Sequence, residues 1–350
     1  MVPLLMTPGP TEVPERIRTA LAHPIVHHRT PEFTEILDDC GSRLKKVFKT
    51  DNTVYTMSGS GTTAMCAALE NTVSKGDKVL SIVFGKFSER FRDIALSVGS
   101  DLETLQFDWG QAPDIGKIEE ALSDDVKAVT MVHNETSTGV RADVEAVGKL
   151  VKDTNALFIC DTISSMAGDN VETDNWNIDL CIAGSQKCFS MPPGIGFLSV
   201  SDKAWPVIEN KEQNYLTDLN KYRSKYPQTP FTAPISLIYG LQEALSIIEE
   251  EGLDKRVQRH RKNAEFTRTA VKEMGLELYP ASEDICSETL TSIRSDRAED
   301  IRSSLKEKGI LVAGAQAPEK GKMFRIGHMG SVGRPEIERT LEALKEVLEI

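Results

Sequence analysis

The residues best placed to do chemistry lie in segment 182–196, which reads IAGSQKCFSMPPGIG. Lys187 follows a short apolar stretch there and precedes a turn rich in proline and glycine. A lysine held partly out of water loses some of its preference for the ammonium form, and its neutral amine can then attack a carbonyl carbon. A solvated, inert lysine at the mouth of a β-hairpin is the alternative, so the residues that accompany Lys187 decide between the two.

A second candidate site is the small, hydroxyl-rich turn 57–64, which reads MSGSGTTA. It lies where a strand-like segment becomes helix-like, so the free N–H groups of the first helical turn and the hydroxyls of Ser60 and Thr62 could hold a phosphate. A glycine turn with serine and threonine caps would look the same. The turn fits neither G-x-x-x-x-G-K-[ST] nor G-x-G-x-x-G, which disfavours a mononucleotide or dinucleotide site.

Asp161 closes the strand-like segment 156–160 and precedes Lys187 by 26 residues. The carboxyl ends of the strands form the ligand-binding edge of an open α/β sheet, although an aspartate there could also cap a following helix. A strand-end aspartate, one more α/β step and then a lysine is the order that a pyridine aldehyde cofactor requires. The carboxylate would keep the ring nitrogen protonated, and the protonated ring would withdraw electrons.

Alternating strand-like and helix-like segments would position these residues. The strand-like segments are 53–57, 77–83, 128–132 and 156–160, and the helix-like segments between them are 62–73, 88–98 and 144–152. Short apolar strands between amphipathic helices predict a mostly parallel α/β sheet that is covered on both faces.

The pattern changes near Pro234. Residues 235–274 predict a long, charged helical region that is interrupted near Gly252. The remaining strands are expected at 276–279, 290–293, 310–312 and 323–326, and the remaining helices at 298–308 and 335–348. This order predicts a small C-terminal α+β domain.

Composition excludes several classes of protein. The chain has 350 residues, 40% of them hydrophobic and 27% charged, which is ordinary for a globular protein of two domains. A net charge of −12 argues against nucleic-acid binding, and no apolar run is long enough to span a membrane. The first six residues lack the basic region of a signal peptide, so we expect a cytoplasmic protein. The six cysteines contain no C-x-x-C pair, so neither a metal site nor a redox dithiol is expected.

In combination, these motifs resemble the class V pyridoxal-phosphate-dependent aminotransferases of fold type I, most closely the alanine–glyoxylate and serine–pyruvate branch. The resemblance runs from TPGP at 7–10 to FRIG at 324–327, and several motifs occur in the right order. It implies pyridoxal 5′-phosphate as the cofactor. It also implies an N-terminal segment over 1–17 that crosses to the active site, a large cofactor-binding domain over 18–245 and a small domain over 246–350.

The resemblance assigns roles to individual residues. Lys187 matches the lysine that forms a Schiff base with the cofactor, and Asp161 takes the catalytic place beside the ring nitrogen. Arg325 matches the arginine that grips the substrate carboxylate, and Gly9 is expected beside the substrate. The residues expected around the cofactor phosphate are Ser60, Gly61, Thr62 and Gln186.

Four further positions follow from the same resemblance. Phe87 would stack on the cofactor ring from the loop after a strand, where many relatives carry tryptophan. Ser137 would form a hydrogen bond near the phenolic oxygen of the cofactor. Tyr226 and Thr229 match a segment that reaches the phosphate of the neighbouring subunit, which implies a homodimer with shared active sites.

The implied reaction is a ping-pong amino transfer. Alanine, serine or aspartate would be the donor, and glyoxylate or pyruvate the accepting 2-oxo acid. A phosphorylated or phosphonate substrate is one alternative, and it would need further cations near Arg325. Cysteine desulfuration is a second and needs a thiol on a mobile loop, for which Cys286 is the only candidate. The alternative that is not an enzyme, a silent assembly protein, would be expected to lack Lys187 or Asp161.

Overall fold

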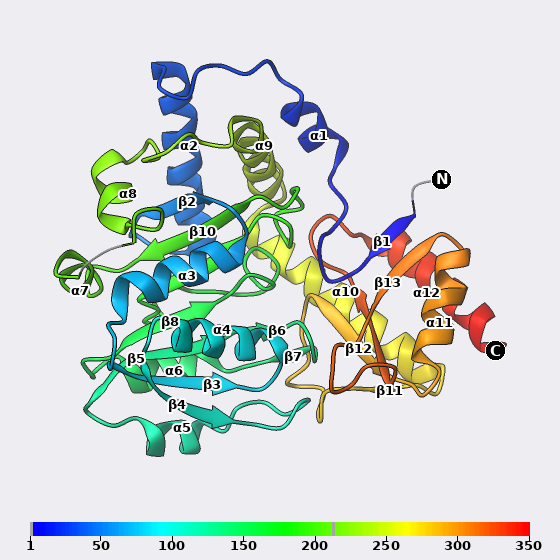
Figure 1. Ribbon diagram of the computed structural model, residues 1–350. Helices are drawn as coiled ribbons and strands as arrows, with labels where there is room; N and C mark the ends of the chain where they lie inside the picture. Colours follow the sequence, from blue (N-terminus) through cyan, green and yellow to red (C-terminus); the bar gives the residue numbers. More distant parts are fainter. Residues whose placement is uncertain (1–2, 212–213) are drawn as a thin grey trace.

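The chain forms two β-sheets with helices packed around them (Figure 1). The computed structural model describes residues 3–211 and 214–350. The larger sheet has seven strands, in the order β2 (Val54–Ser58), β10 (Ile195–Val200), β9 (Leu180–Gly184), β8 (Leu157–Asp161), β5 (Val126–Val132), β3 (Lys78–Val83) and β4 (Asp101–Gln106). The pairs from β9 to β4 are parallel, and β10 is antiparallel to both of its neighbours. The predicted mostly parallel α/β sheet is therefore confirmed.

Helices precede, connect and follow the strands of the larger sheet. They are α2 (Pro31–Phe48), α3 (Gly61–Thr72), α4 (Lys86–Ser97), α5 (Ile115–Ala121), α6 (Val144–Val151), α7 (Trp205–Glu209) and α8 (Leu219–Lys225). The predicted helices at 62–73, 88–98 and 144–152 match α3, α4 and α6 to within two residues. Asp161 caps no helix, because the chain continues from it into turns.

The smaller sheet has five strands, in the order β1 (Leu4–Met6), β13 (Ile310–Gly314), β14 (Met323–Gly327), β12 (Leu290–Arg294) and β11 (Glu277–Leu278). Its helices are α10 (Leu253–Glu273), α11 (Ala298–Glu307) and α12 (Arg334–Leu348). The long helical region predicted at 235–274 is two helices, α9 (Ile235–Glu251) and α10, which meet at Gly252 with a φ of 81°. The interruption expected near Gly252 is confirmed.

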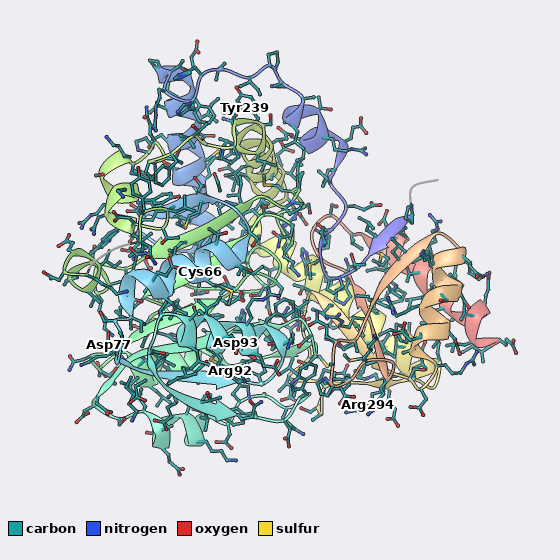
Figure 2. All side chains as sticks on the ribbon, in the orientation of Figure 1. Cys66, Asp77, Arg92, Asp93, Tyr239 and Arg294 are labelled. Atoms are coloured by element: carbon teal, nitrogen blue, oxygen red, sulfur yellow. The ribbon has the colours of Figure 1, made fainter. Side chains whose placement is uncertain are left out.

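Each sheet has its own hydrophobic cluster. Strands β8, β9 and β10 of the larger sheet are buried along their whole length, as continuous apolar runs such as residues 157–160 require. The smaller cluster gathers side chains of β14, α11 and α12, including the fully buried Phe324. All six cysteines are unpaired, and Cys66 on α3 is labelled in Figure 2. Within the described residues, no helix is both long and apolar enough to cross a membrane.

The N-terminal segment connects the two sheets. β1 pairs in parallel with β13 of the smaller sheet, with Leu4 opposite Ile310. The chain then crosses to α1 (Glu15–Leu21), which packs on α9 beside the larger sheet (Figure 1). Residues 7–14 thus pass between the two halves of the molecule, and the candidate site lies beneath them.

Candidate active site

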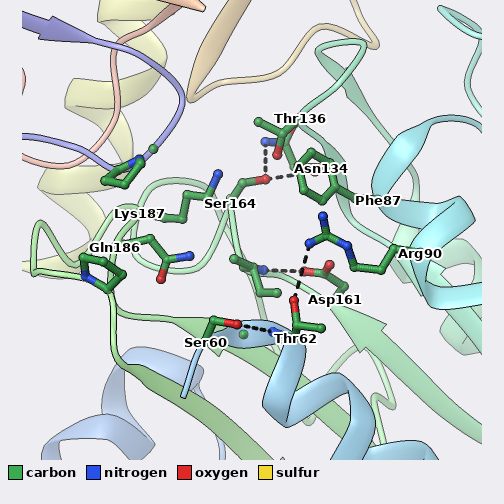
Figure 3. Close-up of a pocket in the computed structure, with 15 residues that line it drawn as sticks. Ser60, Thr62, Phe87, Arg90, Asn134, Thr136, Asp161, Ser164, Gln186 and Lys187 are labelled. Atoms are coloured by element: carbon green, nitrogen blue, oxygen red, sulfur yellow. Dashed lines mark hydrogen bonds between the residues drawn. The ribbon is translucent and has the colours of Figure 1, made fainter. Parts of the chain in front are cut away.

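One cavity of about 330 Å³ contains most of the residues that the sequence singled out (Figure 3). Its walls come from the N-terminal segment, the first turns of α3 and α4, and the loops that follow β8 and β9. The lining residues are Gly9, Pro10, Ser60, Gly61, Thr62, Phe87, Arg90, Asn134, Thr136, Asp161, Ile163, Ser164, Gln186, Lys187 and Pro193. The carboxyl edge of the parallel sheet therefore meets the N-terminal segment at this point.

Lys187 follows β9 and is 8% exposed. Its amine donates a hydrogen bond of 2.5 Å to the carbonyl oxygen of Pro8 and lies 5.8 Å from the centre of the Phe87 ring. Burial, and after it the positive charge of Arg325, lower the pKa of Lys187 from 10.5 to about 8. A substantial fraction of neutral amine near neutral pH is what a nucleophilic lysine needs.

Asp161 is the last residue of β8 and is 4% exposed. One carboxylate oxygen accepts a hydrogen bond of 2.7 Å from the backbone N–H of Ile163. The other oxygen has no hydrogen-bond donor among the described residues. Burial raises the pKa of Asp161 from 3.8 to about 7, because nothing in the protein compensates the buried charge fully. A cation placed in the cavity would supply that compensation.

The hydroxyl-rich turn lies at the start of α3, and it caps this helix as the alternative to a phosphate site would. Ser60 is the N-cap, and its hydroxyl accepts a hydrogen bond from the N–H of Thr62 at 3.3 Å. A Cβ on Gly61 would lie 2.4 Å from Cδ1 of Ile163, so only glycine lets the turn approach the β8 loop this closely. The helix N-terminus and its hydroxyls face the cavity and provide donors for an anion.

Phe87 lies in the first turn of α4 rather than in a loop, because α4 begins directly after the strand and includes it. Sequence reasoning missed Arg90, one turn further along the same face of α4. Its guanidinium carbon lies 5.0 Å from the centre of the Phe87 ring, and it donates to the hydroxyl of Thr62 at 3.4 Å. The three-residue spacing from Phe87 was the available signal.

The segment 133–139 reaches the cavity with different residues from the one expected. Ser137 is fully buried outside the cavity; its hydroxyl accepts from the N–H of Lys86 and donates to Glu135. Asn134, on the short strand Asn134–Glu135, and Thr136, in the turn that follows, line the cavity in its place. Asn134 also donates to Ser164, another lining residue that the sequence did not indicate.

Arg325 lies on β14 behind the cavity wall. It is 5% exposed and donates to the carbonyl oxygens of Thr136 and Gly314, at 2.7 and 2.5 Å. Burial lowers the pKa of Arg325 from 12.5 to about 10, while the negative charge of Glu135 opposes this shift. Its Nε is buried and has no hydrogen-bond partner among the described residues.

Tyr226 and Thr229 do not reach the cavity of their own chain. Tyr226 packs edge-on against Tyr55 at 6.0 Å, and the hydroxyl of Thr229 donates to the carbonyl of Phe231 at 2.6 Å. Neither residue is therefore part of the cavity within a single chain.

Gly9 lies directly over Lys187. Its φ of 97° is in the left-handed region, and a Cβ there would come within 2.5 Å of Cδ of Lys187. Thr11, two residues on, donates from its backbone N–H to the carbonyl of Gln186 and from its hydroxyl to that of Lys187. The N-terminal segment is thereby fixed to the lysine loop.

Two side-chain amide oxygens of cavity residues have no partner in the described part of the chain. Oδ1 of Asn134 and Oε1 of Gln186 are buried without a hydrogen bond among the described residues. Buried polar atoms are rarely left unsatisfied, so unpaired oxygens beside a cavity indicate that a polar ligand belongs there. Together with the amine, the carboxylate and the anion-binding turn, they form a donor and acceptor set that fits pyridoxal 5′-phosphate.

Comparison with known proteins agrees with this geometry. The aminotransferase class-V family model matches residues 14–328. An uncharacterized aminotransferase from Methanocaldococcus jannaschii is 44% identical over 98% of this chain and 93% of its own length. A serine–glyoxylate aminotransferase from Methylorubrum extorquens is 35% identical over 94% of this chain and 86% of its own. The crystal structure of an alanine–glyoxylate aminotransferase from Nostoc sp. superposes with a TM-score of 0.94 at 32% identity, covering 99% of this chain and 96% of that one.

Proposed function

This chain belongs to the class-V aminotransferase family, and we propose that it transfers the amino group of a small amino acid to a 2-oxo acid with pyridoxal 5′-phosphate as its cofactor. Its fold is fold type I of the pyridoxal-phosphate enzymes, and it is a transaminase. One observation carries the finer proposal: Lys187, Asp161 and the Ser60–Thr62 turn border the same cavity.

Different residues of the cavity would hold different parts of the cofactor. Ser60, Gly61, Thr62 and Gln186 would hold the phosphate at the N-terminus of α3, and Phe87 would cover one face of the ring. Asp161 would pair with the ring nitrogen, which supplies the cation that its buried carboxylate lacks. For Ser137, behind the wall, we propose an indirect contribution through Glu135 and the first turn of α4.

When bound, the cofactor supplies a carbonyl that takes up the amino group and a ring that withdraws electrons from the substrate α-carbon. Lys187 would hold the cofactor in place and then remove and return the proton of the α-carbon. Its pKa of about 8 suits both tasks, because a base works best when its pKa lies near the working pH. The N-terminal segment over Lys187 would exclude water during this proton transfer.

We propose that Arg325 and Gly9 orient the substrate. Arg325 would bind the α-carboxylate with the part of its guanidinium that the carbonyls of Thr136 and Gly314 leave free. Gly9 would let the substrate lie against the backbone of the N-terminal segment. The amino donor and the accepting 2-oxo acid would then occupy the same cavity one after the other, as in a ping-pong reaction.

Glyoxylate or pyruvate is the proposed acceptor, and alanine, serine or aspartate the proposed donor. Two of the compared relatives are named for glyoxylate, one with serine and one with alanine as its partner. We further propose a homodimer in which Tyr226 and Thr229 approach the partner's phosphate site, since neither reaches the cavity of its own chain.

The structure favours amino transfer over cysteine desulfuration. Cys286 is 4% exposed, pairs with Val140 in a β-bridge and donates to the carbonyl of Ser282. Burial raises the pKa of its thiol to about 11, which opposes the thiolate that a sulfur nucleophile requires. A silent assembly protein has no need of Lys187 and Asp161 in one cavity.

The proposed function is tested with a panel of amino donors against glyoxylate, pyruvate, 2-oxoglutarate and phosphohydroxypyruvate. The purified protein is loaded with pyridoxal 5′-phosphate, and formation of the new amino acid is measured for each pair. We expect the fastest transfer from a small donor to glyoxylate or pyruvate. A clear preference for phosphohydroxypyruvate would indicate the phosphorylated-substrate alternative, and sulfide release from cysteine without amino transfer would refute the proposal.

A further inference from the structure

A buried carboxylate lies directly behind the wall of the cavity. Glu135, the last residue of β6 (Asn134–Glu135), is fully buried. It accepts hydrogen bonds from the backbone N–H groups of Phe87 and Ser88, at 3.1 and 2.9 Å, and of Ser137 at 3.1 Å. The Ser137 hydroxyl donates to the same carboxylate at 2.6 Å, because its own oxygen already accepts from Lys86. A set made only of donors suits an ionised carboxylate.

Glu135 completes the start of α4. The N-cap of α4 is Gly85, which has no side chain to accept the free N–H groups of the first turn. The Glu135 carboxylate accepts two of them and places a negative charge at the positive end of the helix. The fit is close, since a Cβ on Gly85 would lie 2.4 Å from Cγ of Glu135. The turn held in this way carries Phe87, so the ring in the cavity depends on Glu135.

The same carboxylate acts on Arg325 from the other side. Arg325 donates to the carbonyl of Thr136, the residue that follows Glu135 in the chain. Burial lowers the pKa of Arg325, and the charge of Glu135 raises it again. The cation behind the substrate end of the cavity is thus stabilised by the anion that anchors α4.

We propose that Glu135 is a positioning residue of this active site, which fixes the Phe87 ring through the first turn of α4 and holds the backbone carbonyl of Thr136 to which Arg325 donates. This inference rests on the proposed function, because it concerns the ring-covering and carboxylate-binding residues of that site.

The direct test is Glu135→Gln, which keeps the shape of the side chain. The variant removes the charge and turns an amide NH₂ toward N–H donors. We expect the dissociation constant of the cofactor-free protein for pyridoxal 5′-phosphate to rise about tenfold or more. The circular dichroism of the bound cofactor should change, and KM for the amino donor should rise more than kcat falls. Glu89→Gln is the matched control, since Glu89 lies on the same helix turn and pairs with Lys86 at the surface.

The outcomes separate a positioning role from a structural one. If the melting temperature of the cofactor-free Glu135→Gln variant falls while its cofactor affinity, dichroism and KM stay those of the wild type, the inference is wrong. Glu135→Asp keeps the charge and should recover part of the affinity; binding no better than that of the amide variant would contradict the role of the charge.

Two further results decide the remaining cases. If Glu135→Gln does not fold, Ser88→Ala is the second variant. It removes the Ser88 hydroxyl, which donates to Glu135 at 3.0 Å, and should weaken cofactor binding a fewfold. An unchanged affinity would overturn the inference. A wild-type protein that binds no pyridoxal 5′-phosphate would overturn the proposed function and this inference together. Normal binding by both the wild type and Glu135→Gln would overturn this inference alone.

Discussion

Lys187 donates a hydrogen bond of 2.5 Å from its amine to the carbonyl oxygen of Pro8, which lies 179 residues earlier in the chain. The amine is therefore held at the cavity by the N-terminal segment, even though its own loop follows the larger sheet. Any reaction at this nitrogen must break the contact with Pro8. A change in the N-terminal segment is therefore expected to alter the position of the amine, and a change in Lys187 to alter the segment.

The first prediction concerns the lysine itself. Lys187→Ala should abolish turnover and the visible absorption band of covalently held cofactor, because no other lysine among the described residues lines the cavity. Absorption spectra and amino-transfer assays after loading with pyridoxal 5′-phosphate measure both effects. Lys149→Ala, which removes an exposed lysine paired with Glu145, should behave as the wild type. Near-normal transamination by the Lys187 variant would refute the assignment.

Asp161 should give the cofactor-free protein a specific dependence of stability on pH. Burial raises the pKa of Asp161 from 3.8 to about 7, so the folded protein keeps a proton that the unfolded chain has already lost between these values. The contribution of this group to stability therefore falls as the pH rises from about 4 to about 7.

Asp161→Asn should remove this fall and make the cofactor-free protein more stable at pH 8 by on the order of 2 kcal/mol. Urea unfolding of both proteins between pH 5 and pH 8 measures the difference. The same variant should lose transamination by a factor of about 100 or more, since the ring nitrogen loses its carboxylate partner. Equal slopes of stability against pH in the two proteins would contradict the buried, unpaired state of Asp161.

Gly9→Ala should lower cofactor affinity and activity more than it lowers the stability of the fold. The new Cβ would lie 2.5 Å from Cδ of Lys187, in addition to the strain of a φ of 97°. We expect cofactor affinity and kcat/KM to fall about tenfold or more. Gly275→Ala is the matched control, because its φ is 77° and no atom lies within 4 Å of its Cβ position. Both variants should lose about 1 kcal/mol of stability from the backbone, and only the first should lose activity.

Phe87 should act through the face of its ring. Phe87→Ala is expected to raise the dissociation constant for pyridoxal 5′-phosphate about tenfold, because the stacking surface is lost. Phe87→Trp should retain or improve binding, since a tryptophan offers a larger stacking face and Phe87 is only partly buried. Fluorescence titration of the cofactor-free proteins measures both constants. Equal affinity in the alanine variant would show that the ring does not cover the cofactor.

Arg325→Lys should affect substrate binding selectively. Lysine keeps the charge but loses the planar fork, so KM for the amino donor should rise about 100-fold while kcat changes less. The affinity for pyridoxal 5′-phosphate alone should remain that of the wild type. If cofactor affinity falls instead and KM does not change, Arg325 serves only to hold the carbonyls of Thr136 and Gly314.

The sequence predicts the parts of this molecule that are encoded locally. Lys187, Asp161 and the Ser60–Thr62 turn each stand at the end of a strand, so a short pattern reveals them before any fold is known. β4 is not predicted from the sequence, because its residues Asp101–Gln106 form a half-exposed edge strand without a continuous apolar run. The start of α2 does have a recognisable sequence signal, because Thr30 is the N-cap of the helix and Pro31 is its first residue.

The residues missed in the site are brought there by tertiary packing. Asn134 and Thr136 reach the cavity because Glu135 between them points away and accepts the N–H groups of α4. The orientation of Glu135 depends on a backbone donor that lies 47 residues away in the chain, so no pattern of neighbouring residues predicts it. Ser137 points away for the same reason, and the expected contact with the cofactor gives way to one with Glu135.

The pairing of Leu4 with Ile310 sets the order in which this enzyme can be completed. β1 leaves the ribosome before every strand of the larger sheet, whereas β13, the strand beside which it lies, leaves after all of them. Until β13 has emerged, the segment that carries Gly9 and Pro10 can be held only from the side of Thr11 and α1, and the cover of the cavity is incomplete. A nascent chain could fold the larger sheet with Lys187 already in place, yet it could enclose the cofactor fully only after β13 has been made.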